Sequence, residues 1–138
     1  MYRVIKEGEE KTFSSPFLFE PNGTRLVQIQ PTLKCNLRCL HCYSESGPDL
    51  HDELPSDTLE KFIADAGSLG YNYVGVSGGE PLLWGGLQSF LKHAHNEGFS
   101  TSIITNGTLI EAKQIEGLRD YLGIVAVSVD GHPEEHAA

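Results

Sequence analysis

The amino-acid sequence predicts an α/β fold built on a parallel β-sheet. From about residue 25 onward, short apolar stretches that favour strands alternate with longer segments in which apolar residues recur at helical spacing. Strands separated by helices pair in parallel through right-handed crossovers. A polar or glycine-rich group follows each predicted strand directly, and ligands bind at the carboxyl ends of strands in such folds. We therefore expect one edge of the sheet to carry the function.

Four strands are expected, and each has its own following group. The pattern favours strands over residues 26–30, 73–77, 100–105 and 124–129. The first strand alternates apolar and polar residues and ends at Pro31, whereas the last strand is nearly all apolar. The groups that follow the strands, in chain order, are residues 35–43, 78–81, 106–107 and 130–131. The topology predicts that all four groups converge at one edge of the sheet.

Helices are predicted in the three segments between these strands. In the first, Asp57 and Glu60 have the spacing of a capping box, which satisfies the free N–H groups at a helix start, and Ser56 is the alternative cap. The second carries its apolar residues on one face and ends before Gly98, a good helix stop. In the third, Thr108 and Glu111 again have the capping-box spacing.

Composition and charge limit the possible partners. The chain has 138 residues, which fits one domain, and a net charge of −9. Such an acidic chain without a Lys/Arg cluster is not expected to bind nucleic acid or an anionic membrane surface. The sequence has no apolar run long enough to span a membrane, and its first residues have no apolar signal-peptide core. A cytoplasmic location is the expectation.

The three cysteines of the chain lie together, at Cys35, Cys39 and Cys42, directly after the first predicted strand. Sulfur ligands favour iron–sulfur clusters, zinc and cuprous copper, and a reducing cytosol would keep the thiols free to bind them. A cubane cluster usually has four cysteine ligands. Three cysteines would leave one iron open, as catalysis needs. Two alternatives remain. One is a structural zinc site with His41 as the fourth ligand, although adjacent residues such as His41 and Cys42 rarely bind one tetrahedral ion together. The other is three thiols without a shared role.

The spacing Cys-x3-Cys-x2-Cys followed by Tyr43 resembles the signature of the radical S-adenosylmethionine (radical SAM) enzymes. The resemblance covers roughly residues 24–136. It implies a partial TIM-type (β/α) barrel of six βα units, of which about four are expected here. It also implies that the three cysteines bind a [4Fe–4S] cluster whose open iron is chelated by the amino and carboxylate groups of SAM.

Two glycine-containing motifs downstream carry the resemblance further. By resemblance, Gly78, Gly79 and Glu80 bind the SAM amino group through backbone carbonyl and carboxylate contacts. The alternative is a tight turn in which the glycines supply positive φ. Asn106, within Thr-Asn-Gly after the third strand, would line the SAM pocket, although that tripeptide alone is more typical of a turn.

Four further residues are candidates for contact with SAM. By resemblance, Ser128 and Asp130 after the fourth strand reach the SAM carboxylate or ribose, with a capped turn as the alternative for Asp130. His41 occupies a position where the family often places an aromatic residue near the adenine, and a ring there can stack on the base. His41 and Tyr43 could instead only pack within the loop. No catalytic side chain is identified.

The resemblance also suggests how the chain is organised and what it does. Residues 1–23 are expected to form an N-terminal arm or hairpin, and residues 24–138 the N-terminal part of the core barrel, ending after strand four. On that basis we expect a segment of a longer enzyme, or a truncated product that is weakly active or inactive alone. The residues around the cysteines and the sequence Ser-Val-Asp-Gly most resemble the motifs of the peptide- and protein-maturing (SPASM-type) subgroup.

A member of that subgroup would cleave SAM reductively to a 5′-deoxyadenosyl radical. The radical would abstract hydrogen from a peptide or small-molecule substrate. The partners implied are that substrate and a flavodoxin- or ferredoxin-like electron donor. The alternatives are a non-catalytic Fe–S or zinc-binding module and an inactive truncated remnant.

Overall fold

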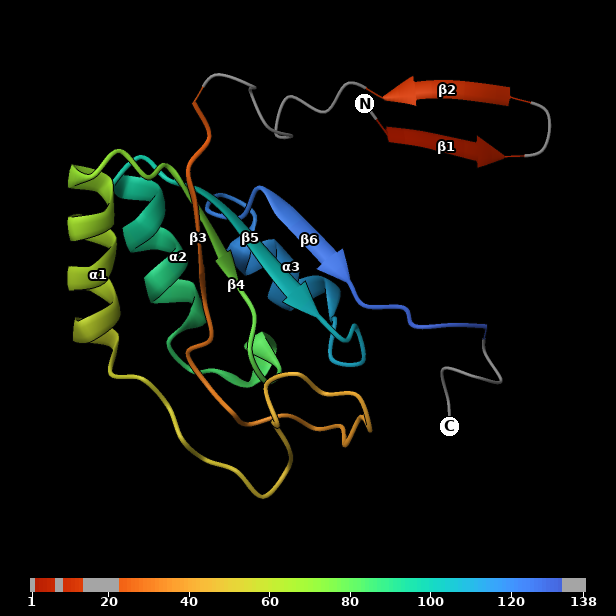
Figure 1. Cartoon of the computed structure of the whole chain (residues 1–138), viewed down its shortest axis with the longest axis horizontal. Coiled ribbons are helices and arrows are strands. Elements are labelled where there is room, and N and C mark those ends of the chain that lie inside the picture. Colours follow the sequence, from red (N-terminus) through yellow and green to blue (C-terminus); the bar gives the residue numbers. More distant parts are fainter. Residues whose placement is uncertain (1, 7–8, 14–22, 133–138) are drawn as a thin grey trace.

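The computed structural model describes residues 2–6, 9–13 and 23–132. Its main element is a four-stranded parallel sheet whose strands lie side by side in chain order (Figure 1). The strands are β3 (Leu26–Ile29), β4 (Tyr73–Val76), β5 (Ser100–Thr105) and β6 (Ile124–Val127). The predicted α/β fold with a parallel sheet is confirmed.

The pairing register brings the carboxyl ends of the strands close to one level. Ile29 pairs with Val76, and Val76 pairs with Ile103. Thr105, two residues further along β5, pairs with Val127. The last strand is shorter than predicted: it ends at Val127 rather than at residue 129, because β5 has already ended at Thr105 and leaves no partner strand beyond that level. All four following groups therefore leave the sheet at the same edge.

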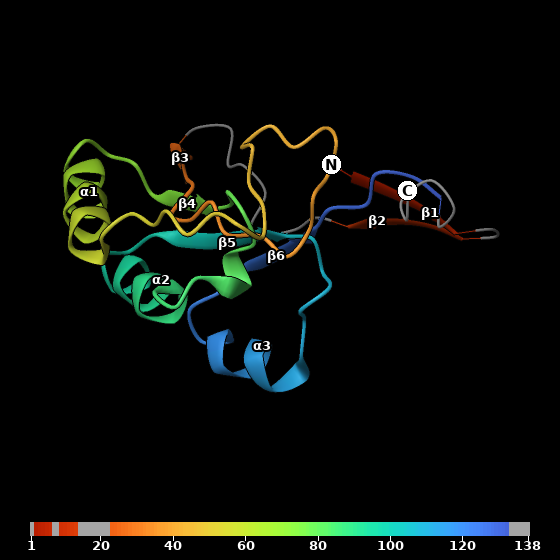
Figure 2. The same cartoon turned by 90° about the horizontal axis from the view of Figure 1, so that it is seen from below.

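The described residues form three α-helices and one 3₁₀ turn between these strands, with α2 and α3 on the same side of the sheet (Figure 2). They are α1 (Ser56–Ser68), α2 (Leu87–Asn96), α3 (Ala112–Leu118) and η1 (Pro81–Leu83).

Neither predicted capping box forms. Pro55 and Glu111 are the N-cap residues of α1 and α3, and neither helix has a side-chain cap. Asp57 lies inside the first turn of α1, where its charge favours the positive end of the helix dipole. Thr108 lies before α3 and its hydroxyl is engaged in hydrogen bonds with loop side chains.

The hydrophobic core lies between the sheet and the helices. Val74, Val76 and Ile103 of the sheet are fully buried, as are Ile63 of α1 and Leu91 of α2. Complete burial of side chains of this size contributes roughly 1.5–3 kcal/mol each. The apolar residues at helical spacing in α1 and α2 thus cover the sheet, except Phe62 of α1, which was expected on that face and is 43% exposed.

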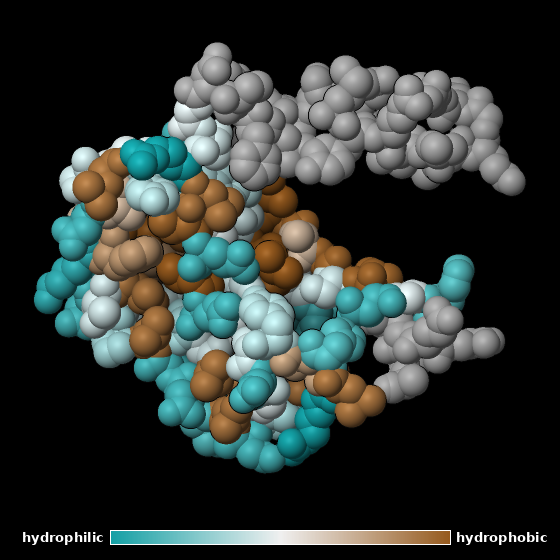
Figure 3. Space-filling model, in the orientation of Figure 1, coloured by the Kyte–Doolittle hydropathy of each residue, from teal (hydrophilic) through white to brown (hydrophobic). Residues whose placement is uncertain are grey.

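Apolar side chains also reach the surface over the sheet (Figure 3). Ile104 of β5 is 38% exposed, and Val125 and Val127 of β6 are 37% and 48% exposed. Their exposure is explained by the strand sequences. A strand that is apolar throughout places apolar side chains on both faces of the sheet, and the helices do not cover all of both faces.

Two segments near the N-terminus form an antiparallel pair, β1 (Tyr2–Lys6) and β2 (Glu9–Phe13). The division of the chain at residues 23 and 24 remains a prediction. In the part of the chain that the structure describes, no helix is long and apolar enough to cross a membrane.

Candidate functional site

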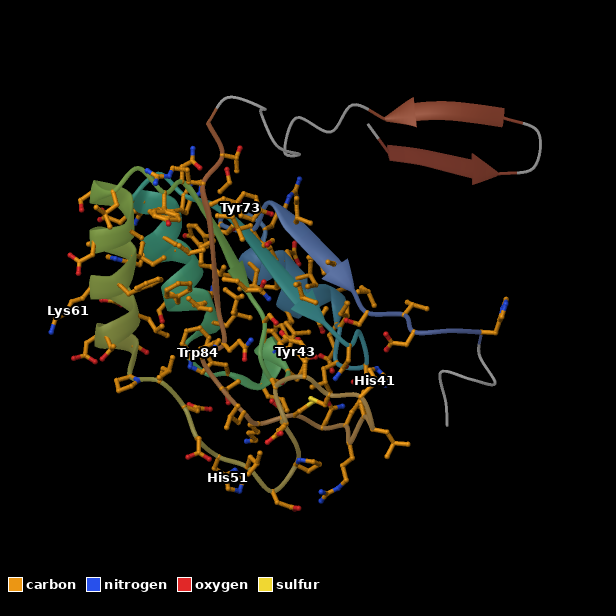
Figure 4. All side chains as sticks on the ribbon, viewed as in Figure 1. His41, Tyr43, His51, Lys61, Tyr73 and Trp84 are labelled. Atoms are coloured by element: carbon orange, nitrogen blue, oxygen red, sulfur yellow. The ribbon has the colours of Figure 1, made fainter. Side chains whose placement is uncertain are left out.

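The groups that follow the four strands meet around one cavity of about 270 Å³. The three cysteines line it, together with His41, Tyr43, Gly78, Gly79, Asn106, Ser128 and Asp130. Figure 4 shows His41 and Tyr43 beside the strand ends, with His51 further out along the same loop. The predicted convergence at one edge of the sheet is confirmed. Larger cavities occur elsewhere, such as one of about 450 Å³ between α2 and α3, but no cysteine lines them.

The loop that carries the cysteines is held at its base by backbone hydrogen bonds. Leu33 donates to the carbonyl of Asp52, and Cys35 donates to the carbonyl of Gly47. Gly47 in turn donates to the carbonyl of Leu33 at 3.1 Å. The loop therefore leaves and returns at adjacent points, although it contains no helix or strand of its own.

Hydrogen bonds reach the sulfur atoms of two of the three cysteines. The backbone N–H of Leu37 lies 3.4 Å from Sγ of Cys35, and Oγ of Ser44 lies 3.4 Å from Sγ of Cys42. The hydrogen bond between Ser44 and Cys42 is the largest of the effects that hold the pKa of the Cys42 thiol below its ordinary value. Because the thiolate is the form that binds metal, this environment favours ligation.

The donor set around the cavity fits an iron–sulfur cluster. Cys35 and Cys42 are half-buried and Cys39 is exposed, and all three are free thiols. Within residues 23–132, no three His, Cys, Asp or Glu side chains are arranged around a single metal ion. A cubane requires no such arrangement, because each thiolate binds a different iron. Nε2 of His41, which lines the same cavity, lies 3.4 Å from Oδ2 of Asp130.

Gly79 lies where two chain segments approach very closely. Its N–H donates to the carbonyl of Thr32 at 2.8 Å, and the N–H of Glu80 donates to the carbonyl of Lys34 at 2.9 Å. A Cβ at Gly79 would lie 2.2 Å from the Lys34 carbonyl oxygen. The glycine therefore allows the end of β4 to lie against the segment that leads into the cysteine loop. The turn interpretation captured only Gly78, whose φ is +103°.

Glu80 lies beneath the cavity rather than on its wall. Its side chain is fully buried, and its carboxylate accepts hydrogen bonds from Leu82 N, Thr105 Oγ1 and Asn106 N. Three donors facing both oxygens suit an ionised carboxylate, which is an acceptor only. Glu80 thus joins the turn after β4 to the end of β5, and its predicted contact with SAM remains a prediction.

The remaining predicted residues line the opening of the cavity. The hydroxyl of Tyr43 hydrogen-bonds to Oγ of Ser77 at the end of β4. Asp130 pairs with His41, with side chains 50% and 69% exposed, respectively. Ser128 donates its backbone N–H to the carbonyl of Thr105 at 2.9 Å. The structure brings all of them to the same site, and their individual roles remain predictions.

Sequence reasoning missed several polar residues of this site. The single hydroxyl proton of Ser44 can go to the carbonyl of Gly78 at 3.1 Å or to Sγ of Cys42 at 3.4 Å, and Ser46 lies 2.8 Å from the same hydroxyl. The alternating serines directly after the cysteines were a usable signal. Asn36, which contacts the Asn106 side chain, had no such signal, because its partner is 70 residues away.

Solved structures share the fold of this chain. *Streptococcus suis* SuiB bound to S-adenosylmethionine superposes with a TM-score of 0.64 and 23% identity, covering 82% of this chain and 25% of SuiB. BtrN in an open conformation gives a TM-score of 0.64 at 19% identity, covering 81% of this chain and 53% of BtrN. These likenesses confirm the partial TIM-type barrel.

Curated proteins are similar in sequence over most of the chain. The Fe-coproporphyrin III synthase of *Methanosarcina barkeri* is 35% identical over 115 residues, which cover 82% of this chain and 29% of that protein. The GTP 3′,8-cyclase of *Helicobacter pylori* is 34% identical over 110 residues, covering 75% of this chain and 34% of that protein. The chain therefore spans about a third of the length of these relatives.

The family profile named Radical SAM superfamily matches residues 29–138. This span includes the three cysteines, the glycine motif after β4 and both later strand ends. The cofactors of that superfamily are a [4Fe–4S] cluster and S-adenosylmethionine. From the match and the geometry of the cavity together, we conclude that the chain belongs to the radical SAM superfamily.

Proposed function

We propose that Cys35, Cys39 and Cys42 bind a [4Fe–4S] cluster and that SAM binds beside it at the carboxyl edge of the sheet. The observation that carries this proposal is the single cavity, which the three thiols share with Gly78 and Gly79. When bound, the two groups supply reductive cleavage of SAM to methionine and a 5′-deoxyadenosyl radical that abstracts hydrogen from a substrate.

The chain's own residues bind and orient these groups. The carbonyl of Gly78 accepts one hydrogen bond, from Ser44, and a carbonyl oxygen has a second lone pair to offer the SAM amino group. Asp130 is an acceptor when ionised, so it suits the hydroxyls of a ribose better than a carboxylate. Ser128 has a hydroxyl that can donate to the SAM carboxylate, and the exposed His41 ring offers a face for the adenine.

The proposed substrate is a peptide or protein, with a flavodoxin- or ferredoxin-like protein as electron donor. The sequences of the cysteine motif and of Ser-Val-Asp-Gly support a peptide substrate. The likeness in fold to SuiB, which has been crystallised with a precursor peptide, supports it as well. A small-molecule substrate is the second candidate, because the curated relatives are named for the synthesis of a porphyrin and the cyclisation of GTP.

Anaerobic reconstitution tests the metal proposal. The purified chain should turn brown and contain about four irons per molecule. Each of the variants Cys35→Ala, Cys39→Ala and Cys42→Ala should lose the cluster, whereas Ser89→Ala on α2 should keep it. Stoichiometric zinc with no uptake of iron would contradict the proposal and support a zinc-binding module.

A second experiment separates catalysis from simple metal binding. The reconstituted chain is incubated with SAM and dithionite, and release of 5′-deoxyadenosine is measured by chromatography. Release that depends on all three cysteines supports a radical SAM enzyme. A bound cluster without any release supports either a non-catalytic Fe–S module or a segment that is inactive alone, and a chain that neither binds iron nor folds by circular dichroism supports an inactive remnant.

A further inference from the structure

The side chain of Asn106 links the end of β5 to the cysteine loop. Its Nδ2 donates to Oδ1 of Asn36 at 3.0 Å and lies 3.8 Å from Sγ of Cys35. Its Oδ1 accepts from the backbone N–H of Thr108 at 2.9 Å. A backbone N–H can only donate, so this contact fixes which end of the carboxamide faces Cys35.

Two further hydrogen bonds close this link into a ring of three side chains. Nδ2 of Asn36 donates to Oγ1 of Thr108 at 2.7 Å, and Oγ1 of Thr108 lies 2.6 Å from Oδ1 of Asn106. Asn36 adjoins Cys35 in the chain, and Thr108 is 72 residues from Asn36. The ring therefore holds together two loops that lie far apart in the sequence.

The backbone of Asn106 is anchored from below by the buried carboxylate. Oε2 of Glu80 accepts the N–H of Asn106 at 2.9 Å, and Oε1 accepts the hydroxyl of Thr105 at 2.7 Å. Glu80 has no exposed surface, so water does not compete for these hydrogen bonds. The carboxamide thus extends toward Cys35 from a point that is fixed on the sheet.

We propose that Asn106 is a positioning residue that holds Cys35 and raises the reduction potential of the cluster bound there. This inference rests on the proposed cluster. Hydrogen bonds to the sulfurs are one of the factors that set the potential of an iron–sulfur cluster. An N–H donor stabilises the more negative, reduced state, so Asn106 makes the cluster easier to reduce. Cys35 then has two donors, Leu37 N–H and the Asn106 carboxamide.

The test is a potentiometric titration of the anaerobically reconstituted chain, without SAM, followed by electron paramagnetic resonance. Asn106→Ala removes the donor, and the ratio of reduced to oxidised cluster at the wild-type midpoint should fall about threefold, as expected for one modest hydrogen bond. Asn106→Asp keeps an acceptor for Thr108 but places an anionic oxygen near Cys35, so its ratio should fall further. The control is Asn96→Ala, an exposed position at the end of α2.

The midpoint potential depends only on the ratio of reduced to oxidised cluster. That ratio is measured in the molecules that contain a cluster, so incomplete loading of a variant does not alter the midpoint. Equal midpoints in wild type, Asn106→Ala and Asn106→Asp would overturn the inference and leave the proposed cluster intact. A wild-type chain that binds no cluster would overturn both.

Hydrogen exchange of the metal-free chain provides a second measurement that needs no cluster. Peptides that cover residues 33–43 should exchange faster in Asn106→Ala than in Asn96→Ala, while those of α1 should not change. Equal exchange of residues 33–43 in the two variants would also contradict the positioning role.

Discussion

Replacing Gly79 with alanine tests how the end of β4 is joined to the cysteine loop. A Cβ at this position would lie 2.2 Å from the carbonyl oxygen of Lys34 and 2.7 Å from its carbonyl carbon. The obstacle is backbone, so no side-chain rotation can relieve it. The chain must either accept the overlap or move the two segments apart.

Both responses have a similar cost. Overpacking at a close contact costs about 1–3 kcal/mol. Moving the segments apart breaks the hydrogen bonds from Gly79 N to Thr32 O and from Glu80 N to Lys34 O, at 2.8 and 2.9 Å. At about 0.5–1.5 kcal/mol each, their loss costs about 1–3 kcal/mol. We expect Gly79→Ala to lower the free energy of unfolding by about 2 kcal/mol by either route.

Urea denaturation of the metal-free chain, followed by circular dichroism, measures this loss. With a slope of about 2 kcal/mol per molar urea, the midpoint should fall by about 1 M. The matched control is Gly85→Ala, because no atom lies within 4 Å of a Cβ there. That variant corrects for the stabilisation of up to about 1 kcal/mol that Gly→Ala produces through the unfolded state. Equal midpoints for the two variants would refute the reasoning.

Three further changes have defined outcomes. Ile63→Ala removes a fully buried side chain of α1 and should lower the free energy of unfolding by about 2–5 kcal/mol in the same urea assay. A decrease of less than about 1 kcal/mol would contradict the place of Ile63 in the core. Ser44→Ala removes the hydrogen bond that lowers the pKa of Cys42. In metal-free protein, alkylation of Cys42 measured by mass spectrometry should therefore reach half its maximal rate at a higher pH. An unchanged pH profile would refute this cause of the lowered pKa. Asp130→Asn removes a carboxylate from an exposed contact with His41 and should change the free energy of unfolding by less than about 1 kcal/mol. A larger loss in the urea assay would contradict the view that Asp130 contributes no more than an exposed surface contact.

Much of the fold could be predicted because its signals are local. The apolar runs of β4 and β6 and the helical spacing of α1 and α2 each lie within one short window of sequence. The position of the site followed from the same windows, since parallel strands in chain order place their carboxyl ends at one edge. Both capping boxes failed because their spacing is short and common, and because competing partners decide where a helix begins.

By itself, the sequence determined the order of strands and helices, the three thiols, and the edge at which they meet the later motifs. The tertiary structure alone decided that Gly79 lies against the carbonyl of Lys34, that Glu80 is buried beneath the cavity, and that Asn106 reaches Asn36. These contacts join residues that are 45 or 70 positions apart or depend on burial from several sides. A pattern of apolar and polar residues records which face of an element is buried, but it does not record which distant backbone or side chain lies against that face.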